Sequence, residues 1–210
     1  MTTLLILGAT GAVGSRALEM ALADTRVDRV VAPTRRPLAE RDGLTNPVLD
    51  FHDLPGDSDI WSVDAVACAL GTTRKLAGSR DAFRQVDHDL PLRVAELTRQ
   101  AGASSYALVS SVGADERSHT FYLRVKGETE NALEKCGFES LTLLRPAGLV
   151  GGVRTRATGI GDHLVEASRA IKPLMPARYR PVHVDRVAAA LVGSAVAADP
   201  GVHVRQSESL

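Results

Sequence analysis

The sequence has little of what marks the specialised classes of protein. Its 25 lysines and arginines balance its 25 aspartates and glutamates, so no net charge draws it to nucleic acid or to an anionic membrane. No apolar run approaches the roughly 20 residues that span a bilayer. The apolar run at the start is shorter than a signal-peptide core and has no positive charge before it. We therefore expect a globular protein without a secretion signal and without nucleic-acid or membrane partners.

Cysteine is also scarce, since only Cys68 and Cys136 are present, far apart and each in an apolar context. Neither has the close Cys or His neighbours of a metal site. The run Asp87-His88-Asp89 resembles a set of metal ligands, but adjacent positions at a helix start do not face one centre. We interpret these residues as solvated or capping groups, with Asp87 or Asp89 as the N-cap of the next helix. The sequence predicts reduced thiols, no metal and a cytoplasmic location.

Apolar runs typical of buried parallel strands alternate along the chain with segments of helical spacing. Parallel neighbours need crossover connections, so this alternation predicts an α/β doubly wound parallel sheet, the Rossmann fold. Length and average composition fit one domain over residues 1–210, with the weakly patterned residues 145–182 as a substrate-side segment. The expected strands are Thr3–Leu7, Arg29–Ala32, Pro47–Leu49, Val63–Leu70, Tyr106–Val109, Leu141–Leu144 and Val202–Val204, and helices are expected around Val13–Ala21, Leu90–Leu97, Phe121–Cys136 and Val184–Ala195.

A glycine-rich turn joins the first expected strand to the first helix. In this turn Gly8 can make the tight bend, Gly11 lets the backbone approach a pyrophosphate, and Gly14 allows close helix packing. The helix N-terminus adds free N–H groups and a favourable dipole. A structural turn is the alternative, but the β-turn-α context favours dinucleotide binding, and no phosphate loop of the G-x-x-x-x-G-K-[ST] type is present. The predicted contacts in this turn are Gly8, Thr10, Gly11, Ala12, Val13 and Gly14.

Further cofactor contacts are expected where later strands end. Arg35 and Arg36 follow the second strand, where NAD enzymes commonly carry an acidic residue for the ribose hydroxyls. A guanidinium suits a 2′-phosphate instead, so the predicted cofactor is NADP(H). Plain turn chemistry is an equal alternative for the remaining contacts. These are Asp50 and Phe51 near adenine, and Ala69, Leu70 and Gly71 near the ribose.

Three polar side chains form the predicted catalytic set. Tyr122 and Lys126 are four residues apart, hence on one helix face and separated by about 6 Å of rise. Ser111 ends the strand before that helix. A phenol has a reference pKa of about 10, so a tyrosine that handles a substrate proton near neutral pH needs a positive charge beside it. Tyr122 is the predicted proton donor, Lys126 its charge partner and a ribose contact, and Ser111 the group that orients the reacting oxygen.

Four blocks of sequence together resemble a known family. Ala69–Arg74, Val109–Asp115, Phe121–Glu128 and Leu144–Gly148 are similar to the Tat-interacting-protein-like oxidoreductases, which are atypical short-chain dehydrogenases. The resemblance covers nearly the whole chain. It implies an NADP-binding Rossmann fold and the same Ser/Tyr/Lys site, and it adds Pro146 and Gly148 to the cofactor contacts. It does not name a substrate, because a fold supports many reactions.

The sequence as a whole predicts an NADP(H)-dependent oxidoreductase that acts on a small carbonyl or alcohol. Two alternatives stay open: a non-catalytic NADP(H) sensor or scaffold that controls a protein partner, and an enzyme of the sugar-nucleotide epimerase or dehydratase type, for which the chain is short. The oligomeric state is not predicted. The substrate-side segment carries a basic excess that could receive an anionic substrate or simply be solvated. The segment has only two acidic residues, Asp162 and Glu166, and its basic residues are Arg145, Arg154, Arg156, Arg169, Lys172, Arg178 and Arg180.

Overall fold

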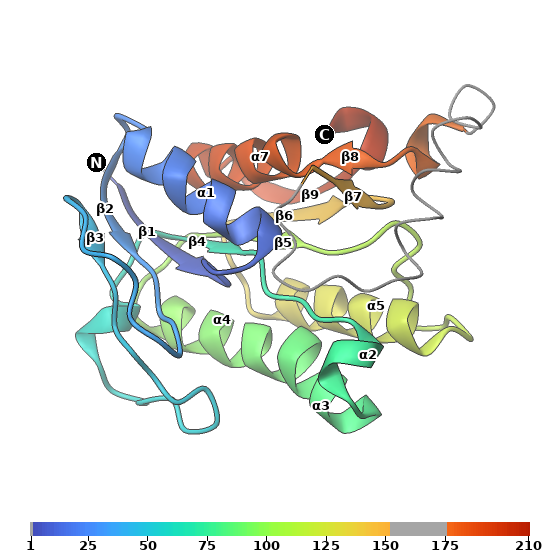
Figure 1. The fold of residues 1–210 in the computed structure, drawn as a ribbon, viewed down its shortest axis with the longest axis horizontal. Helices are drawn as coiled ribbons and strands as arrows, with labels where there is room; N and C mark the ends of the chain where they lie inside the picture. The colour runs from blue at the N-terminus through green and yellow to red at the C-terminus, as the bar shows by residue number, and fades with distance from the viewer. Residues whose placement is uncertain (1, 152–175) are drawn as a thin grey trace.

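A seven-stranded parallel sheet forms the centre of the protein (Figure 1). The computed structural model describes residues 2–151 and 176–210. The strand order is β3-β2-β1-β4-β5-β6-β9, which reverses direction between β1 and β4 as in doubly wound folds. The strands are β1 Thr2–Leu7, β2 Val27–Val31, β3 Leu44–Thr45, β4 Ala65–Cys68, β5 Ser105–Val109, β6 Ser140–Arg145 and β9 Gly201–Gln206. The predicted fold class is confirmed.

Helices cover both faces of the sheet (Figure 1). On one face lie α1 and α7, which pack against β1, β4 and β5. On the other face lie α4 and α5, which cover a second core that includes Trp61 and Tyr106. The two layers bury the sheet completely at its centre, where Leu4 to Leu7 are inaccessible to solvent. The helices are α1 Ala12–Ala23, α2 Arg74–Ala77, α3 Arg80–Arg84, α4 Leu90–Gln100, α5 Phe121–Lys135 and α7 Val184–Ala197.

The third strand differs from the prediction in position. It was expected at Pro47–Leu49, but the sheet pairing lies at Leu44–Thr45, followed by one isolated bridge from Val48 to Thr34. Asn46 and Pro47 separate the strand from this bridge, and Pro47 has no N–H that could donate a hydrogen bond to the neighbouring strand. The side chain of Asn46 bonds to the neighbouring strand in place of the backbone, since its amide nitrogen donates to the backbone oxygen of Ala32 at 2.6 Å.

The helix before β5 also differs from the prediction. It was expected to begin near Leu90 with Asp87 or Asp89 as its N-cap, yet α3 runs through a π-helical turn at Gln85–Asp89 directly into α4. Asp89 has helical backbone angles and makes no side-chain cap bond. The capping role is therefore wrong for both aspartates. Asp87 is buried instead, which the site explains below.

The predicted substrate-side segment, residues 145–182, is described only in part. Two short strands, β7 Leu149–Val150 and β8 Val182–His183, form a separate parallel pair that the sequence pattern did not reveal. The basic and acidic residues predicted at Arg154, Arg156, Asp162, Glu166, Arg169 and Lys172 lie outside the described residues.

Gly127 fixes how closely α5 approaches the loop after β5. A Cβ atom at Gly127 would lie 2.2 Å from the backbone nitrogen of Glu116 and 2.3 Å from the backbone carbon of Asp115. Backbone atoms cannot rotate away as the end of a side chain can. The helix that carries Tyr122 and Lys126 thus sits against this loop only because residue 127 has no side chain.

We expect Gly127→Ala to destabilise the protein by about 2 kcal/mol, the typical cost of overpacking a close contact. Gly193→Ala is the matched control, because Gly193 lies in α7 with nothing within 4 Å of its Cβ position. That control should be neutral or stabilising by up to about 1 kcal/mol, since alanine favours a helix. Urea unfolding of the two variants measures both values. Equal stabilities would contradict the close contact.

Candidate active site

The glycine turn after β1 is built by two close backbone approaches. Gly8 has φ +88°, a conformation that favours glycine, and its Cβ position lies 2.9 Å from the backbone of Ala69 after β4. The Cβ position of Gly14 lies 2.0 Å from the oxygen of Gly8. Gly8 thus makes the predicted tight bend. Gly14 packs closely as predicted, although its immediate neighbour is the backbone of the turn.

The remaining glycine of the turn is open to solvent. Gly11 is exposed, and its Cβ position has one close neighbour, the oxygen of Gly8 at 3.3 Å. Gly11 is also the N-cap of α1, where no side chain makes a cap bond and no acidic residue stands in the first turn. The helix N-terminus therefore keeps N–H groups and its positive dipole end for an anion. These features fit the pyrophosphate of a dinucleotide.

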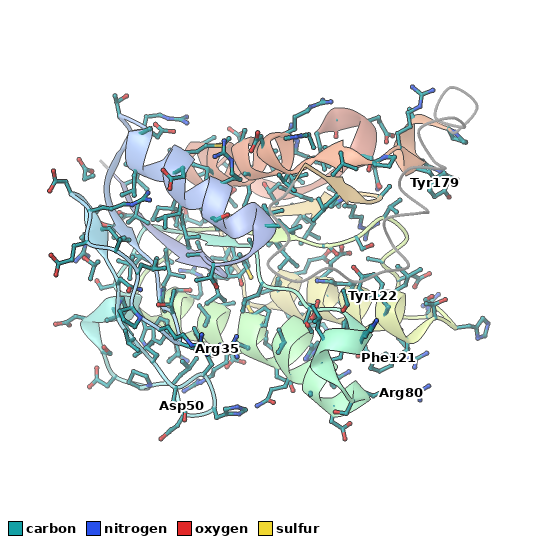
Figure 2. All side chains as sticks on the ribbon, viewed as in Figure 1. Arg35, Asp50, Arg80, Phe121, Tyr122 and Tyr179 are labelled. Carbon is teal, nitrogen blue, oxygen red and sulfur yellow. The ribbon has the colours of Figure 1, made fainter. Side chains whose placement is uncertain are left out.

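Arg35 and Arg36 follow β2 and are both exposed. Neither guanidinium forms an ion pair within residues 2–151 and 176–210. Thr34 is buried beside them, and its hydroxyl donates to the backbone oxygen of Arg36 at 2.6 Å, which fixes the turn. Figure 2 shows Arg35 and Tyr122 well apart along the long axis of the molecule, which is horizontal in this view. Two cations without an ion pair among the described residues thus lie at the end of β2.

The other predicted cofactor contacts lie after β3, β4 and β6. Asp50 is exposed and accepts a bond from the backbone nitrogen of His52 at 2.9 Å, which is turn chemistry. Phe51 packs on the core beneath α4. Ala69 and Leu70 border the glycine turn. The backbone oxygens after β6 are engaged, since that of Pro146 accepts from Val112 and that of Gly148 from Val182.

Two serines directly follow β5, and both are buried. Ser110 is 5% exposed, and its hydroxyl has no hydrogen-bond partner in the described part of the chain. Ser111 is 8% exposed, and its hydroxyl makes one long contact of 3.4 Å with the backbone oxygen of Val112. Both hydroxyls therefore retain hydrogen-bonding capacity at the carboxyl end of the sheet.

Tyr122 lies in the first turn of α5 and is half-buried. Its ring packs against that of Phe83 from α3, with centroids 5.7 Å apart. Phe121 packs on the same ring at 5.7 Å and lies under the guanidinium of Arg80 (Figure 2). Among the described residues nothing forms a hydrogen bond with the Tyr122 hydroxyl. The phenol is thus held by its ring while its oxygen keeps its bonding capacity.

Lys126 is buried next to an acid that the sequence analysis did not place in the site. Its Nζ lies 2.7 Å from Oδ1 of Asp87, with side chains 5% and 0% exposed. The other oxygen of Asp87 accepts from the backbone nitrogen of Thr72 at 2.8 Å. Gly71 borders both groups, because its Cβ position lies 3.5 Å from Oδ1 and 3.7 Å from Nζ. The chain that follows β4, the π-helical turn and α5 thus meet at one buried ion pair.

The charge of Lys126 follows from its surroundings. Burial alone lowers the pKa of a lysine because it penalises the charged form. The Asp87 carboxylate and then Tyr122 raise it by more, so the pKa of Lys126 lies above its ordinary value. Lys126 is therefore an ammonium group at neutral pH, one helical turn from the Tyr122 phenol.

A second pair fixes the far half of α5. Arg145 at the end of β6 donates through Nε to Oε1 of Glu130 at 3.0 Å and through Nη2 to its other oxygen. Glu130 is 2% exposed, and it raises the pKa of Arg145. In the sequence, Arg145 is the first cation of the predicted substrate-side segment. It is instead occupied by a bidentate structural contact.

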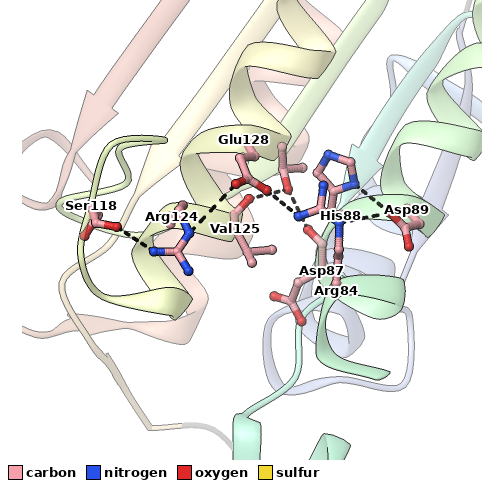
Figure 3. Close-up of polar contacts among 9 residues, drawn as sticks. Arg84, Asp87, His88, Asp89, Ser118, Arg124, Val125 and Glu128 are labelled. Carbon is pink, nitrogen blue, oxygen red and sulfur yellow. Dashed lines mark hydrogen bonds and ion pairs between the residues drawn. The ribbon is translucent and has the colours of Figure 1, made fainter. Parts of the chain in front are cut away.

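More exposed charges link α3 to α5 and lie along the π-helical turn (Figure 3). Glu128 on α5 forms an ion pair with Arg84 of α3 and lies 4.0 Å from Arg124. His88 pairs with Asp89 at 2.7 Å on the outer side of the turn. In the described ranges no three His, Cys, Asp or Glu side chains form a group that could hold a metal ion.

Comparison with known proteins shows the family to which the chain belongs. A family model described as NAD(P)H-binding matches residues 8–195, from the first glycine of the turn into α7. Protein FMP52, mitochondrial, of Kluyveromyces lactis is 35% identical over 161 residues, which cover 75% of this chain and 72% of that protein. Protein HTATIP2 of Rattus norvegicus is 38% identical over 150 residues, covering 69% of this chain and 62% of that protein.

The solved structure of MoeE5 in complex with UDP-glucose and NAD shares the fold. Its TM-score is 0.72 at 20% sequence identity, with 97% of this chain and 75% of that chain covered.

The comparison also corrects the expected location. The similar proteins of Kluyveromyces lactis, Emericella nidulans and Candida glabrata carry the word mitochondrial in their names, so the prediction of a cytoplasmic protein is wrong. That prediction used reduced cysteines and the composition of the first residues, neither of which distinguishes one reducing compartment from another.

The resemblance seen in the sequence is confirmed by the match to HTATIP2 and by the family model. The chain belongs to the NAD(P)H-binding family and fits the atypical short-chain dehydrogenase/reductase superfamily.

Proposed function

We propose that the protein is an NADP(H)-dependent oxidoreductase that transfers hydride to or from a small carbonyl or alcohol substrate. One observation carries the proposal: the buried Lys126 ammonium lies one helical turn from the half-buried Tyr122 phenol, at the edge where the glycine turn also opens. Membership in an NAD(P)H-binding family supports the cofactor class. The choice of NADP(H), the substrate class and the role of Tyr122 are part of the proposal.

The cofactor would be held along the carboxyl edge of the sheet. The turn around Gly11 would bind the pyrophosphate, and Arg35 with Arg36 would bind the 2′-phosphate. The chain after β4 and Lys126 would contact the nicotinamide ribose. When bound, the nicotinamide supplies or accepts the hydride.

The chain's own residues would handle the proton. In reduction Tyr122 donates its phenolic proton to the carbonyl oxygen of the substrate, and Ser111 donates a hydrogen bond to the same oxygen. The Lys126 ammonium stabilises the negative charge left on the phenol oxygen. In oxidation the same groups act in reverse, with Tyr122 as the base.

Tyr122→Phe should lower NADPH-linked turnover by roughly 10²- to 10⁴-fold, the usual effect of removing a general acid, and leave NADPH affinity nearly unchanged. The ring contact with Phe83 remains, so the fold should persist. A screen of carbonyl compounds followed by NADPH absorbance measures turnover, and calorimetry measures affinity. Tyr179→Phe is the control, because Tyr179 is exposed in a different part of the chain. Full activity of Tyr122→Phe would refute this mechanism, and NADPH binding without any turnover would favour the sensor.

Gly11→Val should abolish NADPH binding while the protein still folds. The new side chain enters the space meant for the pyrophosphate, whereas among the described residues its Cβ atom has one close neighbour, the Gly8 oxygen at 3.3 Å. Gly14→Ala is the contrasting variant and should lower the stability of the fold, because its Cβ would lie 2.0 Å from that oxygen. Circular dichroism and calorimetry separate the two effects. A folded Gly11→Val protein with normal affinity would show that the turn is not the cofactor site.

Arg35→Ser should weaken NADPH binding by about tenfold or more and change NADH binding little. A charge-assisted hydrogen bond is worth about 1.5–3 kcal/mol, and NADH has only a hydroxyl at this place. Arg29→Ser is the matched control, because Arg29 is an exposed cation of β2 that lies before the end of the strand. Fluorescence titration with both cofactors gives the ratio. Equal affinities in the unmodified protein would contradict the choice of NADP(H).

A further inference from the structure

Asp87 lies in the π-helical turn between α3 and α4, and its side chain is completely buried. Figure 3 shows that this turn faces α5. Such turns insert an extra residue into a helix and occur frequently at functional sites. Here the turn delivers a carboxylate into the interior, where an ionised group is costly unless it is paired.

Each oxygen of Asp87 has its own contact. Oδ1 lies 2.7 Å from Nζ of Lys126, and Oδ2 accepts from the backbone nitrogen of Thr72 at 2.8 Å. The backbone oxygen of Asp87 accepts from the hydroxyl of Thr129 at 2.9 Å, which ties the turn to α5 without any charge. The carboxylate therefore joins the chain leaving β4 to the proposed catalytic lysine.

A structural role alone explains this ion pair poorly. Burying two charges costs several kcal/mol per ion, and apolar side chains of similar volume often stabilise a protein as well or better. The position of α5 is already fixed by the Arg145–Glu130 pair, the Thr129 bond and the close contact of Gly127. The charge of Asp87 is thus better explained by its effect on Lys126.

The groups that act on Lys126 come from three elements. They are Asp87 of the π-helical turn, Tyr122 of α5 and Cys68 of β4. Burial raises the pKa of the Cys68 thiol, which keeps it neutral. Tyr122 is the proposed proton donor. Asp87, 2.7 Å from Nζ, is therefore the counter-charge that opposes the tendency of a buried lysine to lose its proton.

We propose that Asp87 is a positioning residue of the reductase site, which keeps Lys126 protonated and fixed beside the chain that leaves β4. The purpose of this arrangement rests on the proposed function, because a charged Lys126 matters for the chemistry of Tyr122. The charge state itself can be measured without cofactor, substrate or turnover.

The test is a pH titration of lysine side chains by carbon NMR in the unmodified protein and in Asp87→Asn. The chain has four lysines, so the Lys126 signal can be assigned by its loss in Lys126→Arg; they are Lys75, Lys126, Lys135 and Lys172. In the unmodified protein Lys126 should titrate above an ordinary lysine. In Asp87→Asn its midpoint should fall below that of the exposed lysines, by roughly one pH unit or more.

Asp89→Asn is the matched control, because Asp89 lies in the same turn but pairs with His88 on the exposed side. It should leave the Lys126 midpoint unchanged. An unchanged midpoint in Asp87→Asn would overturn the proposal, since the lysine would then hold its proton without the acid. A shift in both variants would also overturn it, because distortion of the turn would be the cause.

A second variant covers the case in which Asp87→Asn does not fold. The double variant Asp87→Asn/Lys126→Met has no unpaired charge and should recover cooperative thermal unfolding. If the double variant also fails to fold, an unpaired lysine charge does not explain the failure of Asp87→Asn, and the proposal is wrong. Failure of the reductase function would look different: the unmodified protein would show no NADPH-linked turnover, and its lysine titration would be unaffected.

Discussion

A lysine inside a protein stays charged only when a counter-charge compensates for its lost hydration, and the carboxyl edge of this sheet is arranged around that requirement. The 2.7 Å contact between Lys126 and Asp87 joins α5 to the π-helical turn, and the second oxygen of Asp87 joins both to the chain after β4. Three segments of the chain therefore meet at one buried ion pair.

Close backbone contacts complete this edge. Gly8 and Gly14 bring the first turn against the end of β4 and the start of α1, while Gly127 brings α5 against the loop after β5. Each contact excludes a Cβ atom, so the geometry depends on the absence of a side chain at these positions. The open side of Gly11 and the uncapped N-terminus of α1 then leave room for an anion.

Some of the described positive charges are held in ion pairs within the fold, and others are exposed where they can bind an anion. Arg145 is held by Glu130, and Lys126 by Asp87, so both cations are neutralised inside the fold. Arg35 and Arg36 are exposed at the end of β2 without an ion pair in the described part of the chain. A protein with zero formal net charge can in this way present a local anion site.

The sequence by itself determined the alternation of the main strands and helices, the glycine turn and the one-turn spacing of Tyr122 and Lys126, because periodicity and spacing are local properties. It misplaced the third strand, where Pro47 and Asn46 interrupt the ladder. Only the tertiary structure decided that Asp87 is buried against Lys126 and that Glu130 engages Arg145. In each pair the partners come from different elements, across 39 and 15 positions of sequence, and no local pattern distinguishes a carboxylate that caps a helix in water from one that neutralises a cation in the core.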